Sequence, residues 1–120
     1  MTNSKPKRGE IWLVSFEPQV GAEIMKTRPA VILTVTVYSN TPFRVVVPIR
    51  DYKEFHDKAS HLILLEPEQE NGLSKKSSVD CLQVKSFAME RFIHKLGKVT
   101  ADELNEITVA VGMSIGCFPI

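Results

Sequence analysis

The sequence predicts one mostly β domain with a C-terminal helix: a small, strongly bent sheet or barrel whose open side the helix covers. Two observations predict this arrangement. Short runs rich in branched and aromatic residues recur along the chain, and turn residues separate them. Near the C-terminus, the apolar residues change to a helical spacing behind a capping signal. The chain contains no internal repeat and no linker that would divide it.

Six runs are predicted as β-strands. They are Glu10–Phe16, Pro29–Tyr38, Phe43–Ile49, His61–Leu65, Ser77–Phe87 and Arg91–Leu96, the last closed by Gly97. The nearly continuous apolar first half of the second run predicts a central strand covered on both faces. Pro48 cannot donate to a sheet ladder and indicates a bulge or an edge near the end of the third run. The charged segment 50–60 fits either a short helix or an irregular excursion.

The helix is predicted near Ala101 to Gly116. Thr100-Ala-Asp-Glu103 has the spacing of a capping box, and Val99 and Leu104 stand where a hydrophobic staple would be. Apolar residues then recur at steps of three and four, which gives one apolar stripe. They are Leu104, Ile107, Val111 and Ile115. Gly112 weakens the helix by about 1 kcal/mol relative to alanine and indicates close packing on a neighbour.

Length and charge restrict the class of protein. The chain has 120 residues, of which 43% are hydrophobic, and its net charge is +1. This length predicts one domain over residues 8–120, behind a flexible polar tail of residues 1–7. The balanced charge predicts no general affinity for polyanions, and any nucleic-acid contact must come from a local cluster. Cys81 and Cys117 are expected to be reduced thiols. No run is long enough to cross a membrane, and a soluble, cytoplasmic protein is expected.

Candidate functional residues gather where the loop Gln19–Thr27 meets the second strand. Pro29 disfavours the α region for the residue before it, so Arg28 should lie extended at the entrance of the strand. A side chain held there is firmer than one on a mobile loop, which a cation acting on an anionic substrate requires. Glu23, five residues upstream, could supply a complementary acid or base. The alternative is a surface loop that carries useful charges.

Other polar residues have ordinary explanations. The three histidines, His56, His61 and His94, are scattered and are expected at the surface or half-buried. Trp12 is expected in the core rather than as a platform for stacked bases. Lys75 and Lys76, beside two serines, could bind phosphate or form a solvated turn. Further basic residues are spread along the chain, and the sequence leaves open whether they share one face. They are Arg44, Lys53, Lys58, Lys85, Arg91, Lys95 and Lys98.

Several short stretches of the chain form a recognisable series. They are Arg8-Gly9-Glu10-Ile11-Trp12, Gly21-Ala22-Glu23, Lys26-Thr27-Arg28-Pro29-Ala30-Val31, Val47-Pro48-Ile49, Gly72-Leu73-Ser74-Lys75, Ser78-Val79, Gln83-Val84-Lys85-Ser86 and Leu96-Gly97-Lys98-Val99. In this order and at this spacing they resemble the MazF/PemK family of toxin endoribonucleases. The resemblance runs from about Arg8 to Gly116, nearly the whole chain.

The resemblance implies an SH3-like half-open barrel of the CcdB/MazF type that acts as a homodimer. Members of the family cut single-stranded RNA, often mRNA, at short sequences without a metal or another cofactor. A co-expressed antitoxin neutralises them, and through it the toxin can associate with operator DNA. Two functional readings follow: an endoribonuclease toxin, or a non-catalytic or topoisomerase-targeting toxin or binding module on the same fold.

The family's arginine and glutamate carry over to Arg28 and Glu23. The family usually has a threonine or serine after the strand that ends here at Ile49, whereas this chain has Arg50. The substitution implies altered specificity, a second phosphate-binding cation or weakened activity, and Arg50 is therefore a third candidate catalytic residue. Candidate RNA-binding residues are Lys26, Thr27, Gln83, Lys85, Lys75 and Lys76.

Metal-free RNA cleavage can use the 2′-hydroxyl of the substrate as the nucleophile on the adjacent phosphorus. The enzyme then supplies a base, an acid for the leaving 5′-oxygen and cations for the charge on phosphate. Glu23 is the candidate base and Arg28 the candidate phosphate clamp, because the planar guanidinium matches phosphate oxygens. Gln83 could read a base edge or orient the backbone, as is common in the recognition of single-stranded RNA.

Overall fold

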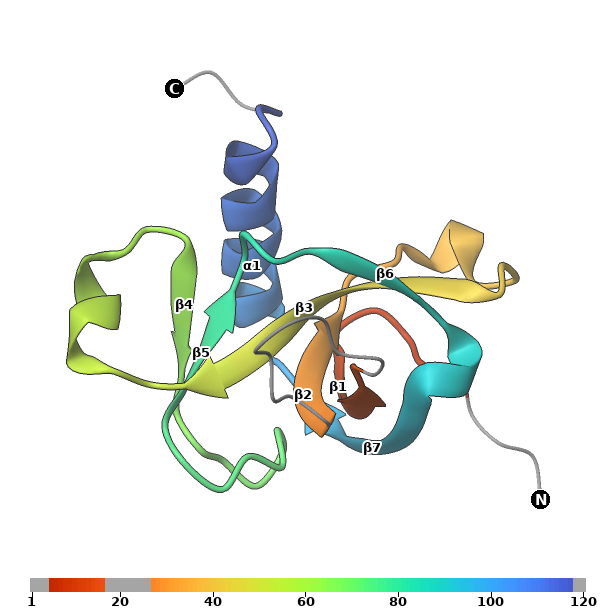
Figure 1. Ribbon diagram of the computed structural model, residues 1–120, viewed down its shortest axis with the longest axis horizontal. Coiled ribbons are helices and arrows are strands. Elements are labelled where there is room, and N and C mark those ends of the chain that lie inside the picture. Colours follow the sequence, from red (N-terminus) through yellow and green to blue (C-terminus); the bar gives the residue numbers. More distant parts are fainter. Residues whose placement is uncertain (1–4, 17–26, 118–120) are drawn as a thin grey trace.

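The computed structural model describes residues 5–16 and 27–117. These residues form a seven-stranded antiparallel sheet and one 14-residue α-helix (Figure 1). The strands are β1 (Glu10–Ser15), β2 (Thr27–Ile32), β3 (Phe43–Asp51), β4 (Leu62–Leu65), β5 (Ser77–Asp80), β6 (Lys85–Ala88) and β7 (Phe92–Lys98). The helix α1 is Ala101–Ser114, and short 3₁₀ turns lie at Thr36–Tyr38 (η1), Glu54–Lys58 (η2) and Met89–Arg91 (η3).

The strand β2 lies at the centre of the sheet and is covered on both faces, as predicted. The strand order is β4-β5-β3-β2-β1-β7. Val31 belongs to the larger core cluster, on the side of the helix, while its neighbours Ala30 and Ile32 belong to a second cluster with Trp12. Successive side chains of a strand point to opposite faces, so the unbroken apolar run feeds both clusters. Trp12 is a core residue, in edge-to-face contact with Phe92 at 6.3 Å between ring centroids.

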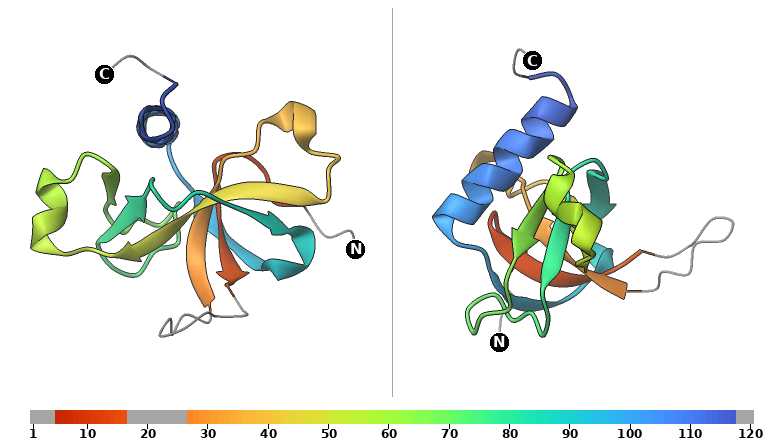
Figure 2. Two further views of the ribbon diagram at one scale, coloured as in Figure 1. Left: turned by 45° about the horizontal axis from the view of Figure 1, so that its top comes forward. Right: turned by 90° about the vertical axis from the view of Figure 1, so that its left-hand side faces the viewer.

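The long strand β3 bends the sheet by pairing with different neighbours along one side. Its first half pairs with β6, for example Val46 with Lys85, and its end pairs with β5, beginning with Ile49 opposite Val79. Pro48 lies between these two pairings and opposite Ala30 of β2, so it marks a change of partner inside the sheet and not an edge. β4 and β7 are the outermost strands of the order and do not pair with each other, which leaves the barrel half open (Figure 2).

The predicted strand Pro29–Tyr38 is too long, because β2 ends at Ile32. The chain turns back at once to form β3: Leu33 N donates to Val45 O at 2.8 Å, and Thr34 Oγ1 accepts from Val45 N at 2.7 Å. Thr36–Tyr38 is the 3₁₀ turn η1, and its valine and tyrosine are exposed. A high β propensity there is overridden because no strand lies beside it.

The predicted strand Ser77–Phe87 is two strands, β5 and β6, joined by a turn. Asp80 makes the turn: its Oδ1 accepts from Leu82 N at 3.2 Å, and its carbonyl accepts from Gln83 N at 3.2 Å. An aspartate that binds the backbone two residues onward is a common turn former. The two strands then pair with opposite ends of β3 in registers that differ by three residues, so the pairing is interrupted at the turn.

The sixth predicted strand continues through Gly97 to Lys98 rather than closing there. Gly97 is needed for close approach and not as a stop, because a Cβ at this position would collide with the carbonyl oxygen of Glu70. Gly72, with φ of +71°, packs equally closely against the Leu96 carbonyl. The two glycines let the loop 66–76 lie directly on β7, and Lys98 N donates to Glu70 O at 2.9 Å.

The helix has the predicted capping box. Glu103 N donates to Thr100 Oγ1 at 3.1 Å, and Thr100 N donates to Glu103 Oε1 at 2.9 Å. Val99, Leu104 and Ile107 pack in the larger core cluster, together with Ala110 and Val111. Ile115 does not belong to the buried stripe: it caps the helix C-terminus and is 67% exposed, because α1 ends at Ser114 and not at Gly116.

Arg44 holds the N-terminal segment against the sheet. Its side chain is buried, its Nε donates to Pro6 O at 2.8 Å, and its two Nη atoms donate to carbonyls of residues 39, 41 and 43. Pro6 is buried as well. The described end of the predicted tail, residues 5–7, therefore belongs to the folded domain.

Candidate functional site

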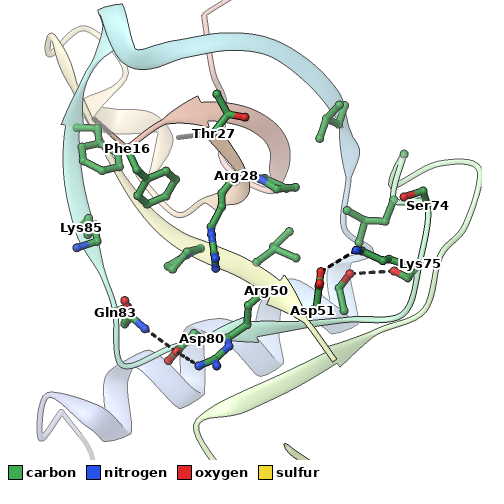
Figure 3. A pocket seen from close by; sticks show the side chains of 18 of the residues that line it. Phe16, Thr27, Arg28, Arg50, Asp51, Ser74, Lys75, Asp80, Gln83 and Lys85 are labelled. Atoms are coloured by element: carbon green, nitrogen blue, oxygen red, sulfur yellow. Dashed lines mark hydrogen bonds and ion pairs between the residues drawn. The ribbon is translucent and has the colours of Figure 1, made fainter. Parts of the chain in front are cut away.

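A cleft of about 1080 Å³ opens on the face of β2 and β3 that lies away from α1 (Figure 3). The start of β2 and the end of β3, including Pro48 and Ile49, form its floor. The β5–β6 turn and β6 supply one wall, through Asp80, Gln83 and Lys85. The loop 66–76, through its residues 72–75, and Ser77 at the start of β5 supply the opposite wall. The cleft is therefore built from segments that are distant in the sequence.

The lining of the cleft is rich in cations. Six basic side chains and two carboxylates contribute to it: Arg28, Arg50, Lys53, Lys75, Lys85 and Arg91, with Asp51 and Asp80. The excess of four positive charges contrasts with the chain's net charge of +1. Local clustering of this kind attracts polyanions even when the whole protein is almost neutral. Phe16 and Phe87, also in the lining, offer apolar ring surface beside the charges.

Arg28 and Arg50 emerge into the cleft from neighbouring strands. Arg28 is the second residue of β2, extended as predicted, and pairs with Val14 of β1. In the β2–β3 register, Ala30 lies opposite Pro48. The pairing of the two strands ends at this pair. Arg28 and Arg50 each lie two residues beyond it, so by the alternation of side chains along a strand they face the same way as Ala30 and Pro48. Figure 3 shows both guanidinium groups directed into the cleft.

Arg50 and Gln83 meet at the carboxylate of Asp80. Oδ2 of Asp80 accepts from Arg50 Nη1 at 3.2 Å and from Gln83 Nε2 at 2.8 Å. The Asp80 side chain is only 4% exposed, whereas that of Arg50 is 38% exposed. Gln83 comes from the β5–β6 turn. The cation in place of the family hydroxyl is thus paired with an acid while it still faces the cleft.

The two lysines of the loop 66–76 have different surroundings. Lys75 lines the cleft, and its Nζ lies 3.1 Å from Asp51 Oδ1 in an exposed ion pair. Lys76 is not part of the lining, and its Nζ lies 4.2 Å from the centre of the Tyr52 ring. The structure thus brings Thr27, Gln83, Lys85 and Lys75 together with the two arginines but sets Lys76 apart. Glu23 and Lys26 lie outside the described residues.

Several contributors to the cleft were not singled out in the sequence, among them Arg91, Lys53 and Asp80. Arg91 and Lys53 were two of many scattered basic residues, and only the fold brings them to the cleft. Arg91 Nη1 donates to Ser15 O at 3.3 Å, and its guanidinium lies over the ring of Phe87. Asp80 was hidden inside a predicted strand. Polar residues at 80 and 83, spaced as in a turn, were the available signal.

His56 is buried, contrary to the expectation of a surface or half-buried residue. Its Nδ1 accepts from Lys53 N at 3.1 Å and lies 2.8 Å from Ser78 Oγ, which anchors η2 on β5. Burial, together with the positive charge of Arg50, lowers the pKa of His56 from its ordinary value. Since Nδ1 is occupied as an acceptor, the neutral imidazole is the form that fits. Burial also raises the pKa of the Cys81 thiol to about 12, which makes it unreactive.

The described residues contain no group of three or more His, Cys, Asp or Glu side chains placed to hold a metal ion. In the same part of the chain, no helix is long and apolar enough to span a membrane.

Comparison with known proteins identifies the family of the chain. The family model of the PemK-like, MazF-like toxins of type II toxin–antitoxin systems matches residues 7–115. The chain is 28% identical to Endoribonuclease MazF9 of Mycobacterium tuberculosis over 112 residues, covering 91% of this chain and 95% of the relative. It is 33% identical to Endoribonuclease PemK of Escherichia coli over 106 residues, covering 87% and 77%.

The fold is also found in solved structures. An endoribonuclease in complex with its cognate antitoxin, from a mycobacterial species, superposes with a TM-score of 0.74 at 17% identity, covering 95% of this chain and 99% of that one. The mostly β fold with a C-terminal helix and a half-open sheet is that of the MazF toxins, as predicted. The chain belongs to the PemK/MazF family of toxins of type II toxin–antitoxin systems.

Proposed function

We propose that the protein is an endoribonuclease that cuts single-stranded RNA in the cationic cleft, without a metal, at a short sequence. The observation that carries the proposal is that Arg28 and Arg50, from the neighbouring strands β2 and β3, line one cleft with excess positive charge. Two guanidinium groups that enter one cleft from neighbouring strands suit a phosphodiester, since each can donate two hydrogen bonds to phosphate oxygens. The names of the relatives support the same chemistry.

In this reaction the substrate's 2′-oxygen attacks the adjacent phosphorus. The O2′–P bond forms as the P–O5′ bond breaks, which leaves a 2′,3′-cyclic phosphate and a free 5′-hydroxyl. Arg28 and Arg50 stabilise the negative charge that accumulates on the non-bridging oxygens. Glu23 takes the proton of the 2′-hydroxyl in this proposal, and a donor in the cleft returns a proton to the 5′-oxygen.

Binding of the RNA strand draws on the rest of the cleft. Lys75, Lys85 and Lys26 contribute positive charge along the backbone path, and Thr27 offers a hydroxyl beside Arg28. Phe16 and Phe87 provide ring surface against which an unstacked base can lie. Gln83 presents an amide that can both donate to and accept from a base edge.

The experiment is cleavage of a long single-stranded RNA by the purified protein in EDTA, with the cut positions and the chemistry of the new ends determined. We expect cuts at a short recurring sequence, with cyclic phosphate at one end and 5′-hydroxyl at the other. Binding without any cut would favour the binding-module reading instead. Cleavage that depends on added metal would refute the proposed mechanism.

The same cleft is proposed to receive the inhibitory partner. A solved structure of this fold holds its cognate antitoxin. Acidic side chains of such a partner would compete with RNA phosphates for Arg28 and its basic neighbours, so the excess positive charge serves both interactions. Through the antitoxin, the toxin would also associate with operator DNA. A neighbouring open reading frame whose product relieves growth arrest on co-expression would identify the partner.

We further propose that the protein is a homodimer acting in the cytoplasm. Large apolar side chains are exposed on several elements of the described chain, among them Val37, Tyr38 and Phe43 around η1 and the start of β3. A second group, Met113 and Ile115, lies at the end of α1. A pairing that removes such surface from water is favourable, and a stable one buries about 1,200 Å² or more in total.

A further inference from the structure

Asp80 is the one buried carboxylate among the described residues that line the cleft. Both of its oxygens are engaged. Oδ1 accepts from the backbone of Leu82, and Oδ2 accepts from the side chains of Arg50 and Gln83. A carboxylate removed from water is strongly unfavourable unless it is hydrogen-bonded and paired. The contacts of Asp80 with Arg50 and Gln83 are therefore part of what makes its burial tolerable.

The contact with Asp80 restricts the conformations of the Arg50 side chain. Its side chain is long and 38% exposed at the end of β3, and without a partner it would sample many rotamers. Asp80 takes one N–H of the guanidinium, at Nη1. A guanidinium carries five N–H donors in a rigid fork, so fixing one of them orients the rest. Figure 3 shows the Arg50 side chain crossing the floor of the cleft toward Asp80.

Gln83 is tied to the same oxygen atom. Its side chain is exposed on the β5–β6 turn, and its Nε2 donates to Asp80 Oδ2 at 2.8 Å. With Nε2 engaged in this contact, the amide plane is restrained while its carbonyl oxygen can accept from a base. A phosphate-binding cation and a base-reading amide are thus held within hydrogen-bond distance of one acceptor.

We propose that Asp80 is a positioning residue that couples phosphate binding by Arg50 to base recognition by Gln83. It sets the spacing between the phosphate and the base that the cleft accepts together, and so contributes to the choice of cleavage sequence. This inference rests on the proposed endoribonuclease function. Asp80 does not touch the reacting atoms and acts through Arg50 and Gln83.

Two simpler roles for Asp80 make different predictions. As a turn former only, it would stabilise the β5–β6 connection, and its loss would lower the melting temperature without a specific effect on cleavage. As a negative charge only, it would weaken RNA binding, and its loss would lower KM. A positioning role instead predicts a fall in kcat and in sequence discrimination, both of which depend on Arg50 or Gln83 being present.

The test is a double-mutant cycle with Asp80→Asn, Arg50→Gln and the double variant, on an oligoribonucleotide with a mapped cut site and on a copy with one base changed. We expect Asp80→Asn to lower kcat/KM by about 10-fold or more, by analogy with residues that orient metal ligands, and to reduce discrimination between the two substrates. In the Arg50→Gln background, the same change should alter kcat/KM by about twofold or less.

Asp51→Asn is the matched control, because it removes the same charge from the same cleft. The Asp51 carboxylate is 61% exposed and contacts Lys75 rather than Arg50. We expect it to lower KM, with an effect that added salt removes. Multiplicative effects of Asp80→Asn and Arg50→Gln, or an Asp80→Asn variant that behaves like Asp51→Asn, would overturn the positioning role.

If Asp80→Asn does not fold, the cycle is run with Gln83→Ala and Arg50→Gln, whose side chains reach the cleft from outside the core. Coupling between these two changes supports the proposal, and independent effects overturn it. If the wild type cuts no RNA, the proposed function fails, and the cycle is measured as Kd for a 2′-O-methyl oligonucleotide instead. Coupling in Kd then keeps Asp80 as an organiser of a binding site, whereas additive effects or no binding overturn it.

Discussion

Arg28 provides the most direct test of the proposed chemistry. We predict that Arg28→Ala lowers kcat for cleavage of a defined oligoribonucleotide by about 10² to 10³-fold, as expected when a preorganised donor to a developing negative charge is removed. That factor corresponds to about 2.7–4 kcal/mol of transition-state stabilisation. Arg28→Lys should also fail substantially, because a point charge does not reproduce the planar fork.

The structure distinguishes this loss of kcat from two other possible effects of Arg28→Ala, one on the stability of the fold and one on the general attraction of RNA. The backbone of Arg28 pairs with Val14 whatever its side chain is, and the side chain is only half-buried, so the free energy of unfolding should change by about 1 kcal/mol or less. General attraction of RNA is shared among six basic side chains of the cleft. Losing one of them should mainly raise KM, because it removes one of several contacts that bind the strand. Each neutralised phosphate of a single strand contributes only about −0.7 to the slope of log K against log salt.

The assay is single-turnover and steady-state cleavage, with circular dichroism and the melting temperature as folding controls. Arg91→Ala is a matched comparison: it removes an equal charge from the same cleft, but Arg91 comes from η3 and its guanidinium lies over Phe87. We expect Arg91→Ala to act mainly on KM. If folded Arg28→Ala cuts as fast as the wild type, or loses no more kcat than Arg91→Ala, the catalytic role of Arg28 is wrong.

Four further predictions follow from other parts of the molecule. Arg50→Thr restores the family hydroxyl and removes the contact between Arg50 and Asp80, so the mapped cut sequences should change. An identical cut pattern and rate would show that position 50 is not part of the site. Because the pKa of His56 is lowered in the folded protein, the unfolded chain binds a proton at this residue at a higher pH than the folded protein does. The melting temperature should therefore be constant above about pH 6.5 and fall as the pH drops below that value. The variant His56→Gln should show a weaker dependence on pH. Gly97→Ala places a Cβ against the carbonyl of Glu70 and should destabilise the fold by about 1–3 kcal/mol in urea unfolding, whereas an unchanged midpoint would mean that the loop 66–76 readily moves away. Light scattering at micromolar concentration should give twice the 13.5 kDa mass of one chain, and a monomer mass would refute the dimer.

Features set by neighbouring residues were predictable from the sequence. The capping box joins Thr100 and Glu103, which lie three residues apart, so its two hydrogen bonds need no distant partner. The extended conformation of Arg28 follows from the ring of Pro29. The apolar run after it predicted a central strand because a buried strand must present apolar side chains to both faces. The order of the family motifs predicted the SH3-like half-open barrel and identified Arg28 and Arg50 as candidate site residues.

Features that depend on where strands end were only partly predictable. β2 stops at Ile32 because β3 returns beside it, and β-prone residues beyond that point have no strand to pair with. Asp80 divides one predicted strand into two, a turn whose residues were visible in the sequence but were outweighed by their β-prone neighbours. His56 is buried because η2 folds back on Ser78 of β5, a contact between segments 22 residues apart.

Residue type and order by themselves determined that the chain folds as a β domain with a capped helix, and that it carries enough arginine and lysine to bind an anion. Only the tertiary structure decided which of these cations line one cleft. Arg28 and Arg50 share a cleft because β2 and β3 are antiparallel neighbours whose pairing ends just before these two residues. Arg44, from the same strand as Arg50, does not line the cleft. Its side chain is buried and donates to backbone carbonyls, among them those of Pro6 and Ser39. Register between strands is a property of the packed sheet, because it depends on which faces bury their apolar side chains together.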